Sequence, residues 1–285
     1  MSSSGKKRAV IFVHFDKDGI LDPHVQFCLG ELRKHCATLI FVSASILPAE
    51  LEKAARICDK AISRENEGYD FVSWKVGLGL LESPESYDEI TFVNDSCYGP
   101  LFDLGKVFKR ADAKVCDMWG LTYSHDISPH IQSFFFSFRK KIISSLDFKG
   151  FWDSVESLDH KAEIVRKYEV GMTSYFRERG YRIFAFFDIF SMSFMERFVA
   201  AFYNGPYLHR KFTRVFRGFL RGKRVRNPMH AYWCSVLNRG VPFVKVELLR
   251  DNPLKVELPR VWHFLKKCER YDEGLARRHL ERINS

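Results

Sequence analysis

The sequence contains no Cys-x-x-Cys pair, no internal repeat and no apolar run near the ~18 residues of a membrane-spanning helix. Its seven cysteines are odd in number and irregularly spaced, which argues against both a zinc site and a disulfide framework. Reduced thiols of this kind are typical of the cytosol, so we expect a cytoplasmic protein. The first residues, MSSSGKKRAV, lack the apolar core of a secretory signal.

Positive charge and aromatic side chains are what the sequence has in excess. Its 285 residues carry a formal net charge of +10, and 15% of them are Phe, Tyr or Trp. This apolar content is ample for a folded core. A strongly basic protein attracts anions, so an anionic membrane surface or a phosphorylated small molecule is an expected partner. We do not expect nucleic acid, because RNP, zinc-finger and helix-turn-helix signatures are missing.

Apolar segments alternate with helical patterns along the first third of the chain. Strands that are apolar throughout and separated by helices are typical of parallel βαβ units with helices on both faces. The sequence therefore predicts an α/β fold with a Rossmann-type, mostly parallel sheet. We expect strands at 8–15, 38–43, 60–63, 89–93, 119–122, 133–138 and 181–187, and helices at 23–35, 48–58, 70–81 and 163–179.

The stretch EITFVNDSCYGPL, residues 89–101, leads an apolar strand directly into an isolated acid, Asp95. Parallel sheets bind ligands at the carboxyl ends of their strands, which is where Asp95 lies. A carboxylate there can hold Mg²⁺ or Mn²⁺, and such an ion can bridge the two phosphates of a nucleotide sugar. The neighbours Asn94 and Ser96 supply no second carboxylate. An ordinary turn-forming aspartate explains the same residues, and the sequence alone leaves both interpretations open.

A polar loop, RENEGYDFVSW, precedes the third expected helix. Arg64 could pair with a diphosphate, while Asn66 and Gly68 allow close approach of the backbone to a ligand. We expect Asp70 to cap the helix that follows. A solvated loop without a ligand is the alternative.

Glu169 lies in the expected amphipathic helix 163–179, which should stop at Gly180. A carboxylate on the acceptor side of a site can act as a general base toward a sugar hydroxyl. The residue four positions later is Thr173, so Glu169 has no i,i+4 ion pair there to explain it. An exposed helical glutamate without a function is the alternative.

The segment 205–226 holds eight Lys or Arg and no acid. Its apolar residues, among them Leu208, Phe212 and Phe219, share one helical face. This pattern is typical of a helix that lies on an anionic membrane surface. It is equally typical of a helix that packs on a domain and leaves its basic face in solvent.

Several segments together resemble the rhamnan-synthesis F family of glycosyltransferases. They follow the family's order over most of residues 8–253 and read VHFDKDGILDPHV, IFVSAS, ENEGYDFVSWKVGL, YDEITFVNDSCYGPLFDL, WGLTYSHDISPHIQSFFFSFRKKII, KYEVGMTSYFRERGY and NPMHAYWCSVLNRGVPFVKVELLRDNP. The resemblance implies a GT-A-like fold and an inverting transfer, with rhamnose the expected sugar. The product would be a cell-surface polysaccharide such as a lipopolysaccharide O-antigen.

The resemblance also implies roles for single residues. Asp95 corresponds to the strand-end aspartate that binds metal and diphosphate, with Mg²⁺ or Mn²⁺ as the cofactor, and Glu169 to the catalytic base. Further nucleotide-sugar contacts are expected from Asp16, Asp18, Ser43, Arg64, Asn66, Gly68 and Asn94, and acceptor contacts from Trp119 and His125.

On this interpretation residues 1–204 form the catalytic domain and residues 205–285 a basic, helical extension that packs on it. The expected donor is a dTDP- or GDP-linked deoxysugar, and the acceptor a lipid-linked or growing glycan. The basic helix would hold the protein at the inner face of the cell membrane. Because the strand-end motif has one carboxylate, a non-catalytic glycan- or nucleotide-binding scaffold in polysaccharide assembly is the alternative.

Overall fold

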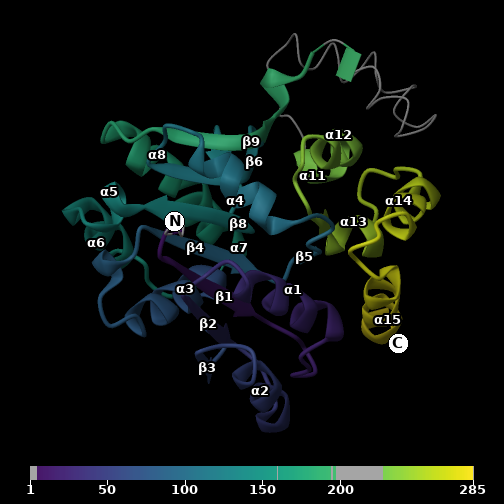
Figure 1. Cartoon of the computed structure of the whole chain (residues 1–285), viewed down its shortest axis with the longest axis horizontal. Coiled ribbons are helices and arrows are strands. Elements are labelled where there is room, and N and C mark those ends of the chain that lie inside the picture. The colour runs from purple at the N-terminus through teal and green to yellow at the C-terminus, as the bar shows by residue number, and fades with distance from the viewer. Residues whose placement is uncertain (1–4, 159, 194, 197–226, 285) are drawn as a thin grey trace.

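The computed structural model describes residues 5–158, 160–193, 195–196 and 227–284 (Figure 1). The basic segment 205–226, with its expected membrane-surface helix, lies outside the described residues. Within them, no helix has the length and apolar character needed to cross a membrane.

Eight strands form one central sheet in the order β3-β2-β1-β4-β8-β6-β7, and β9 also pairs with β6. Neighbours from β3 to β4 are parallel, as are β6 and β9, whereas β8 runs antiparallel to both β4 and β6. The strands are β1 (Arg8–His14), β2 (Thr38–Ser43), β3 (Lys60–Ser63), β4 (Glu89–Asn94), β6 (Met118–Ser124), β7 (His130–Ile131), β8 (Phe135–Arg139) and β9 (Ile183–Asp188).

The expected α/β fold with a mostly parallel sheet is confirmed, but the reversal of β8 was not predicted. No helix lies between β6 and β8. A parallel neighbour needs a crossover of a dozen or more residues, whereas an antiparallel one can be reached through a short loop. The chain therefore returns beside β6 in the opposite direction and enters the sheet between β6 and β4.

Helices cover both faces of the sheet (Figure 1). Alternate residues of β1 divide between two cores, because successive side chains of a strand point to opposite faces. Val10 and Phe12 join the cluster that includes α1 and α4, and Ile11 and Val13 join the cluster that includes α3 and α8. The helices of these layers are α1 (Pro23–Arg33), α2 (Pro48–Ala55), α3 (Tyr69–Gly79), α4 (Leu104–Asp112), α5 (Lys140–Ile143), α6 (Leu146–Asp153), α7 (Lys161–Ile164) and α8 (Gly171–Glu178), with short helical turns η1 (Pro84–Ser86) and η3 (Ile189–Ser191).

Two helix boundaries test the sequence expectations. The predicted helix 163–179 is a run from α7 through a π-helical segment, η2 (Val165–Val170), into α8, and Gly180 follows it at a φ of +82°. The expectation that Asp70 caps α3 is wrong. Gly68 precedes that helix at a φ of +64° without a side-chain cap, and Asp70 lies inside the first turn.

The described part of the C-terminal extension is helical, as expected, and gathers at one end of the molecule beside α1 (Figure 1). It comprises α11 (Pro228–Ala231), α12 (Trp233–Asn238), α13 (Val246–Arg250), α14 (Leu258–Lys266) and α15 (Glu273–Asn284), with a strand β10 (Val244–Lys245) that pairs antiparallel with β5 (Cys97–Tyr98). Tyr98 and Leu101 are buried in the apolar core of this part. A side chain at Gly99 would meet the Pro242 carbonyl oxygen at 2.5 Å, so the close approach of the two segments requires glycine there.

Candidate functional site

Six strands end at one edge of the sheet, since β1, β2, β3, β4, β6 and β9 all point the same way. Their last residues are His14, Ser43, Ser63, Asn94, Ser124 and Asp188. Open α/β sheets bind ligands beyond this carboxyl edge. The topology therefore brings the loops that carry most of the expected site residues to a common surface.

Asp95 follows β4 at this edge and is half-buried. Its Oδ2 accepts a hydrogen bond from the Phe15 N–H at 2.8 Å, which ties it to the end of β1. Burial raises the pKa of the Asp95 carboxyl to about 7. The nearby acids Asp70 and Asp16 also raise this pKa, whereas the hydrogen bond from Phe15 lowers it. A carboxyl poised near neutrality at a strand end is a feature of functional sites.

The residues on either side of Asp95 are held by side-chain hydrogen bonds. Asn94 Nδ2 donates to Asp70 Oδ2 at 2.8 Å, which is what the Asp70 carboxylate does in place of the expected helix cap. Asn94 Oδ1 in turn accepts from the Ser96 hydroxyl at 2.5 Å. The side chains of Asn94 and Ser96 thus fix the turn that presents Asp95.

Lys245 is a site residue that the sequence analysis missed. It lies on β10, 149 positions from Ser96, and its Nζ donates to the Ser96 Oγ at 2.8 Å. It supplies positive charge beside a motif that has only one carboxylate. The signal that could have found it is the lysine at the centre of PFVKVELL, inside a segment that carries the family resemblance.

Asp16 and Asp18 reach the edge from the loop after β1, but both face an arginine from the last helix. Arg282 on α15 contacts both Asp16 oxygens and lies 2.8 Å from Asp18 Oδ2. Burial alone would raise the pKa of Asp16, but Arg282 and the N–H groups of Ile20 and Asp18 hold it below its usual value. Asp16 therefore stays ionised near neutral pH.

Two expected contact residues are in the wrong environment for a ligand. Ser43 has no exposed surface, and its hydroxyl is bonded to His14 Nδ1 and to the Ser45 carbonyl. Trp119 is also fully buried, near the start of β6, and its indole N–H donates to Glu89 Oε2 at 2.9 Å. The nucleotide contact at Ser43 and the acceptor contact at Trp119 are both wrong, because each side chain is enclosed in the core.

The loop of Arg64, Asn66 and Gly68 precedes α3. The Arg64 guanidinium donates to the carbonyls of Glu65 at 2.7 Å and Tyr69 at 3.1 Å, and its Nε donates to Ser73 Oγ. These bonds shape the loop itself. Asn66 is exposed at its tip, whereas Gly68 is buried and a side chain there would meet Val72 at 2.3 Å.

Glu169 lies in η2, the π-helical segment, with its side chain 19% exposed. Its Oε1 accepts from the Ser133 N–H at 3.2 Å and lies 3.8 Å from His130 Nε2. The next residue, Phe134, accepts from the Asn94 N–H through its carbonyl. Glu169 and the Asp95 turn therefore contact adjacent residues of one backbone segment, so the structure brings the two acids to the same region of the edge.

His125 follows β6 and lies farther along the edge. Its Nε2 is 3.0 Å from Asp188 Oδ1 at the end of β9, and the Phe190 ring packs against it with a centroid separation of 4.3 Å. His125 is partly exposed, so it remains available for the expected acceptor contact.

Asp95 fits a metal ion that takes most of its ligands from the substrate. Mg²⁺ is commonly bound through one or two carboxylates, with phosphate oxygens and water completing the octahedron. Asp95 offers one carboxylate oxygen free of the Phe15 bond in a half-buried position. A resident ion held by protein ligands alone would need more donors than this turn has.

Comparison with known proteins decides the family. A family model described as "Rhamnan synthesis protein F" matches residues 39–206, more than half of the chain. This chain belongs to the rhamnan synthesis protein F family. The "Virulence protein VirA" of Vibrio anguillarum is 31% identical over 258 residues, which cover 87% of this chain and 81% of that protein. The resemblance read from the sequence is confirmed.

Solved structures give weaker likenesses to this member of the rhamnan synthesis protein F family. The glycosyltransferase GlyE of Streptococcus pneumoniae matches 72% of this chain and 51% of its own, with a TM-score of 0.41 and 11% identity. The TarS 1–349 structure of S. aureus matches 91% of this chain and 78% of its own, with a TM-score of 0.40 and 13% identity. Because both scores are low, the family assignment rests on the sequence matches.

Proposed function

We propose that this chain is an inverting glycosyltransferase of the rhamnan synthesis protein F family, which moves a sugar from a nucleoside-diphosphate donor to a growing cell-surface polysaccharide. The observation that carries the proposal is the family match over residues 39–206, which contains both Asp95 and Glu169. Rhamnose is the expected sugar, and a dTDP- or GDP-linked deoxysugar the expected donor. The acceptor is a lipid-linked or growing glycan.

In the proposed reaction the acceptor hydroxyl attacks the anomeric carbon of the donor. Glu169 accepts the hydroxyl proton as the new carbon–oxygen bond forms, and the nucleoside diphosphate leaves with the electron pair of the broken bond. One displacement inverts the configuration. The Glu169 side chain, between Ser133 and His130, keeps 19% of its surface exposed, which gives its carboxylate access to solvent and hence to an acceptor.

On the donor side the diphosphate meets Asp95 and Lys245. Mg²⁺ or Mn²⁺ bound at Asp95 would neutralise charge that develops on the two phosphates. Lys245, held 2.8 Å from Ser96 Oγ, adds a fixed positive charge next to the same turn. Asn94 holds the turn in place through its hydrogen bond to Asp70.

The proposal is tested by nucleoside diphosphate release from dTDP-, GDP- and UDP-sugars, with and without Mn²⁺. Loss of a general base lowers the rate by about 10²–10⁴-fold, so the turnover of Glu169→Gln should be lower than that of the parent protein by at least this factor. Glu178→Gln is the matched control, because Glu178 is exposed at the end of the same helical run. If Glu169→Gln turns over as fast as the parent protein, Glu169 is not the catalytic base.

The alternative is a non-catalytic nucleotide- or glycan-binding scaffold. Two observations favour it: the strand-end motif has a single carboxylate, and the Arg64 guanidinium is bonded to carbonyls of its own loop. Saturable nucleotide binding without release of diphosphate from any of these donors, in the presence of membranes that contain lipid-linked glycan, would favour the scaffold. Turnover would exclude it.

A further inference from the structure

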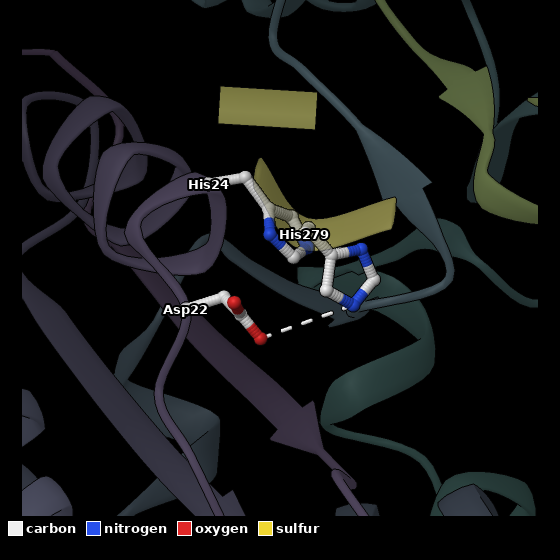
Figure 2. Close-up of side chains that lie close together, drawn as sticks. All are labelled: Asp22, His24 and His279. Carbon is white, nitrogen blue, oxygen red and sulfur yellow. Dashed lines mark ion pairs between the residues drawn. The ribbon is translucent and has the colours of Figure 1, made fainter. Parts of the chain in front are cut away.

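Asp22, His24 and His279 form a cluster next to the carboxyl edge (Figure 2). Asp22 immediately precedes α1, His24 is in its first turn, and His279 comes from α15. One potential ligand atom from each residue lies within 4.8 Å of the other two. Among the residues that the structure describes, no other group of three His, Cys, Asp or Glu comes this close together.

One ring nitrogen of His24, a member of this cluster, has no hydrogen-bond partner. Its side chain is 3% exposed, and its Nδ1 is buried without a hydrogen-bond partner. Leaving a buried polar atom unsatisfied costs free energy, so such an atom in a folded protein needs a reason. A buried imidazole nitrogen without a partner can donate its lone pair to a metal ion, and histidine is the commonest metal ligand in proteins.

His279 has the orientation of a metal-binding histidine. Its Nδ1 is 2.7 Å from the Tyr98 hydroxyl, and its Nε2 is 3.8 Å from Asp22 Oδ2, with the Asp22 carboxylate and the ring facing each other (Figure 2). In metal sites, one ring nitrogen is held by a hydrogen bond so that the other points at the ion. Tyr98 holds Nδ1 in this way, since it is buried and fixed in β5.

The Asp22 carboxylate turns away from the helix that it precedes. A residue at this position usually caps the first-turn N–H groups, but the Asp22 side chain makes no such bond. Instead its two oxygens accept from Arg282, at 3.2 Å from Nε and 2.5 Å from Nη2. Each carboxylate oxygen has a second lone pair, and Asp22 Oδ2 presents one on the side of His279.

The charge around the cluster suits a divalent cation. Arg282 is shared by three carboxylates, Asp16, Asp18 and Asp22, and Asp18 also pairs with Lys17, so three negative charges face two positive ones. Arg250, the other cation that acts on His279, is paired with Asp251 at 2.8 Å. His14 on the same side is buried and its pKa is lowered to about 4, so it adds no charge.

We propose that Asp22, His24 and His279 bind one divalent transition-metal ion of the Zn²⁺ class, which fastens α15 to the loop between β1 and α1. Two imidazoles and a carboxylate favour such ions over Mg²⁺, which prefers oxygen ligands. Bonds of about 2.0–2.1 Å place tetrahedral ligands roughly 3.3 Å apart, so the side chains would close by at most about 1.5 Å when the ion binds. The site is distinct from the Mg²⁺ or Mn²⁺ expected at Asp95.

The experiment titrates Zn²⁺ and Co²⁺ into the chelator-treated full chain by calorimetry and visible absorption. We expect one ion per chain, a Co²⁺ spectrum of low-symmetry nitrogen and oxygen ligation, and a rise in thermal midpoint with Zn²⁺ but not with Mg²⁺. His279→Ala and Asp22→Asn should each weaken binding by about 100-fold or more, and Tyr98→Phe, which removes only the orienting hydrogen bond, by about 10-fold. His263→Ala, an exposed histidine on α14, is the matched control and should bind as the parent does.

Binding that survives in both His279→Ala and Asp22→Asn, with folded far-UV spectra, would overturn the proposal, as would failure of the parent to bind either ion. Two substitutions on different elements are used so that one unstable variant does not decide the result. The readouts involve no sugar nucleotide. Loss of metal binding with intact transfer, or the reverse, therefore separates this site from the proposed reaction.

Discussion

Replacing Asp95 with asparagine should stabilise the protein, and more strongly as the pH rises. Burial raises the pKa of this half-buried carboxyl to about 7, whereas an aspartate in an unfolded chain titrates near about pH 3.9. The folded state therefore favours the protonated acid. Its contribution to stability is present below about pH 4 and is lost as the pH rises through about 7, because ionisation in the half-buried position then opposes folding.

The magnitude follows from the difference between the two pKa values. About three pKa units at about 1.4 kcal/mol each give roughly 4 kcal/mol once Asp95 is fully ionised. Asp95 keeps some exposure to solvent, which screens part of this cost. The amide oxygen of asparagine can still accept from the Phe15 N–H. We therefore expect Asp95→Asn to raise the free energy of unfolding by about 2–4 kcal/mol at about pH 8.5 and by about a third as much at about pH 5.

Urea unfolding at the two pH values measures this difference directly. Asp112→Asn is a control of opposite sign. Burial would raise the pKa of Asp112, but Arg8 and Lys6 outweigh it and lower the pKa. Its loss should destabilise the protein by about 1 kcal/mol at neutral pH and by less in acid. An Asp95→Asn effect that is absent, or equal at both pH values, would refute the account of Asp95.

Two further predictions concern charges. Lys245→Met should weaken the binding of dTDP or GDP about 10-fold or more in calorimetry, because a hydrogen bond to a charged group is lost. The control Lys266→Met, on the exposed face of α14, should bind as the parent does. If Lys245→Met and the parent protein bind the nucleotide equally well, Lys245 is not part of the site. Glu89→Gln should lower the free energy of unfolding by about 3 kcal/mol, because it leaves the buried Arg8 guanidinium without the charge that it contacts at 2.9 Å. A loss below about 1 kcal/mol would show that Asp112 alone compensates Arg8.

The sheet could be predicted because the pattern that indicates each strand lies within a short stretch of sequence. Each central strand is an apolar run between helical patterns, and the strand-end rule then places Asp95 at the ligand edge without further knowledge. The direction of β8 was not predicted from its own residues, because SFFFSF is equally apolar in either orientation. The short connection from β6 was the available clue, and it decides in favour of an antiparallel pair.

The errors at single residues have a different cause. Ser43 ends a strand at the correct edge, but its hydroxyl is used by His14 and Ser45, which the sequence does not show. Trp119 is an amphipathic side chain that could face an acceptor or the core, and Glu89 on β4, beyond the intervening β8, supplies a buried partner for its N–H. In both cases the exposure of a polar atom depends on a residue distant in the chain.

The same dependence governs the C-terminal part, where sequence patterns suggested an extension packed on a complete catalytic domain. Lys245 contacts the Asp95 turn, and Arg282 contacts the loop after β1. These residues come from beyond position 226 and supply the positive charge that the strand-end motif, with its single carboxylate, lacks. A catalytic domain that ended near residue 204 would present Asp16, Asp18 and Asp95 to a diphosphate without either cation. Because like charges repel in a half-buried site, this arrangement would oppose donor binding. If the proposed function is correct, β10 and α15 therefore belong to the donor side of the site, and the predicted boundary at residue 204 does not separate catalysis from attachment.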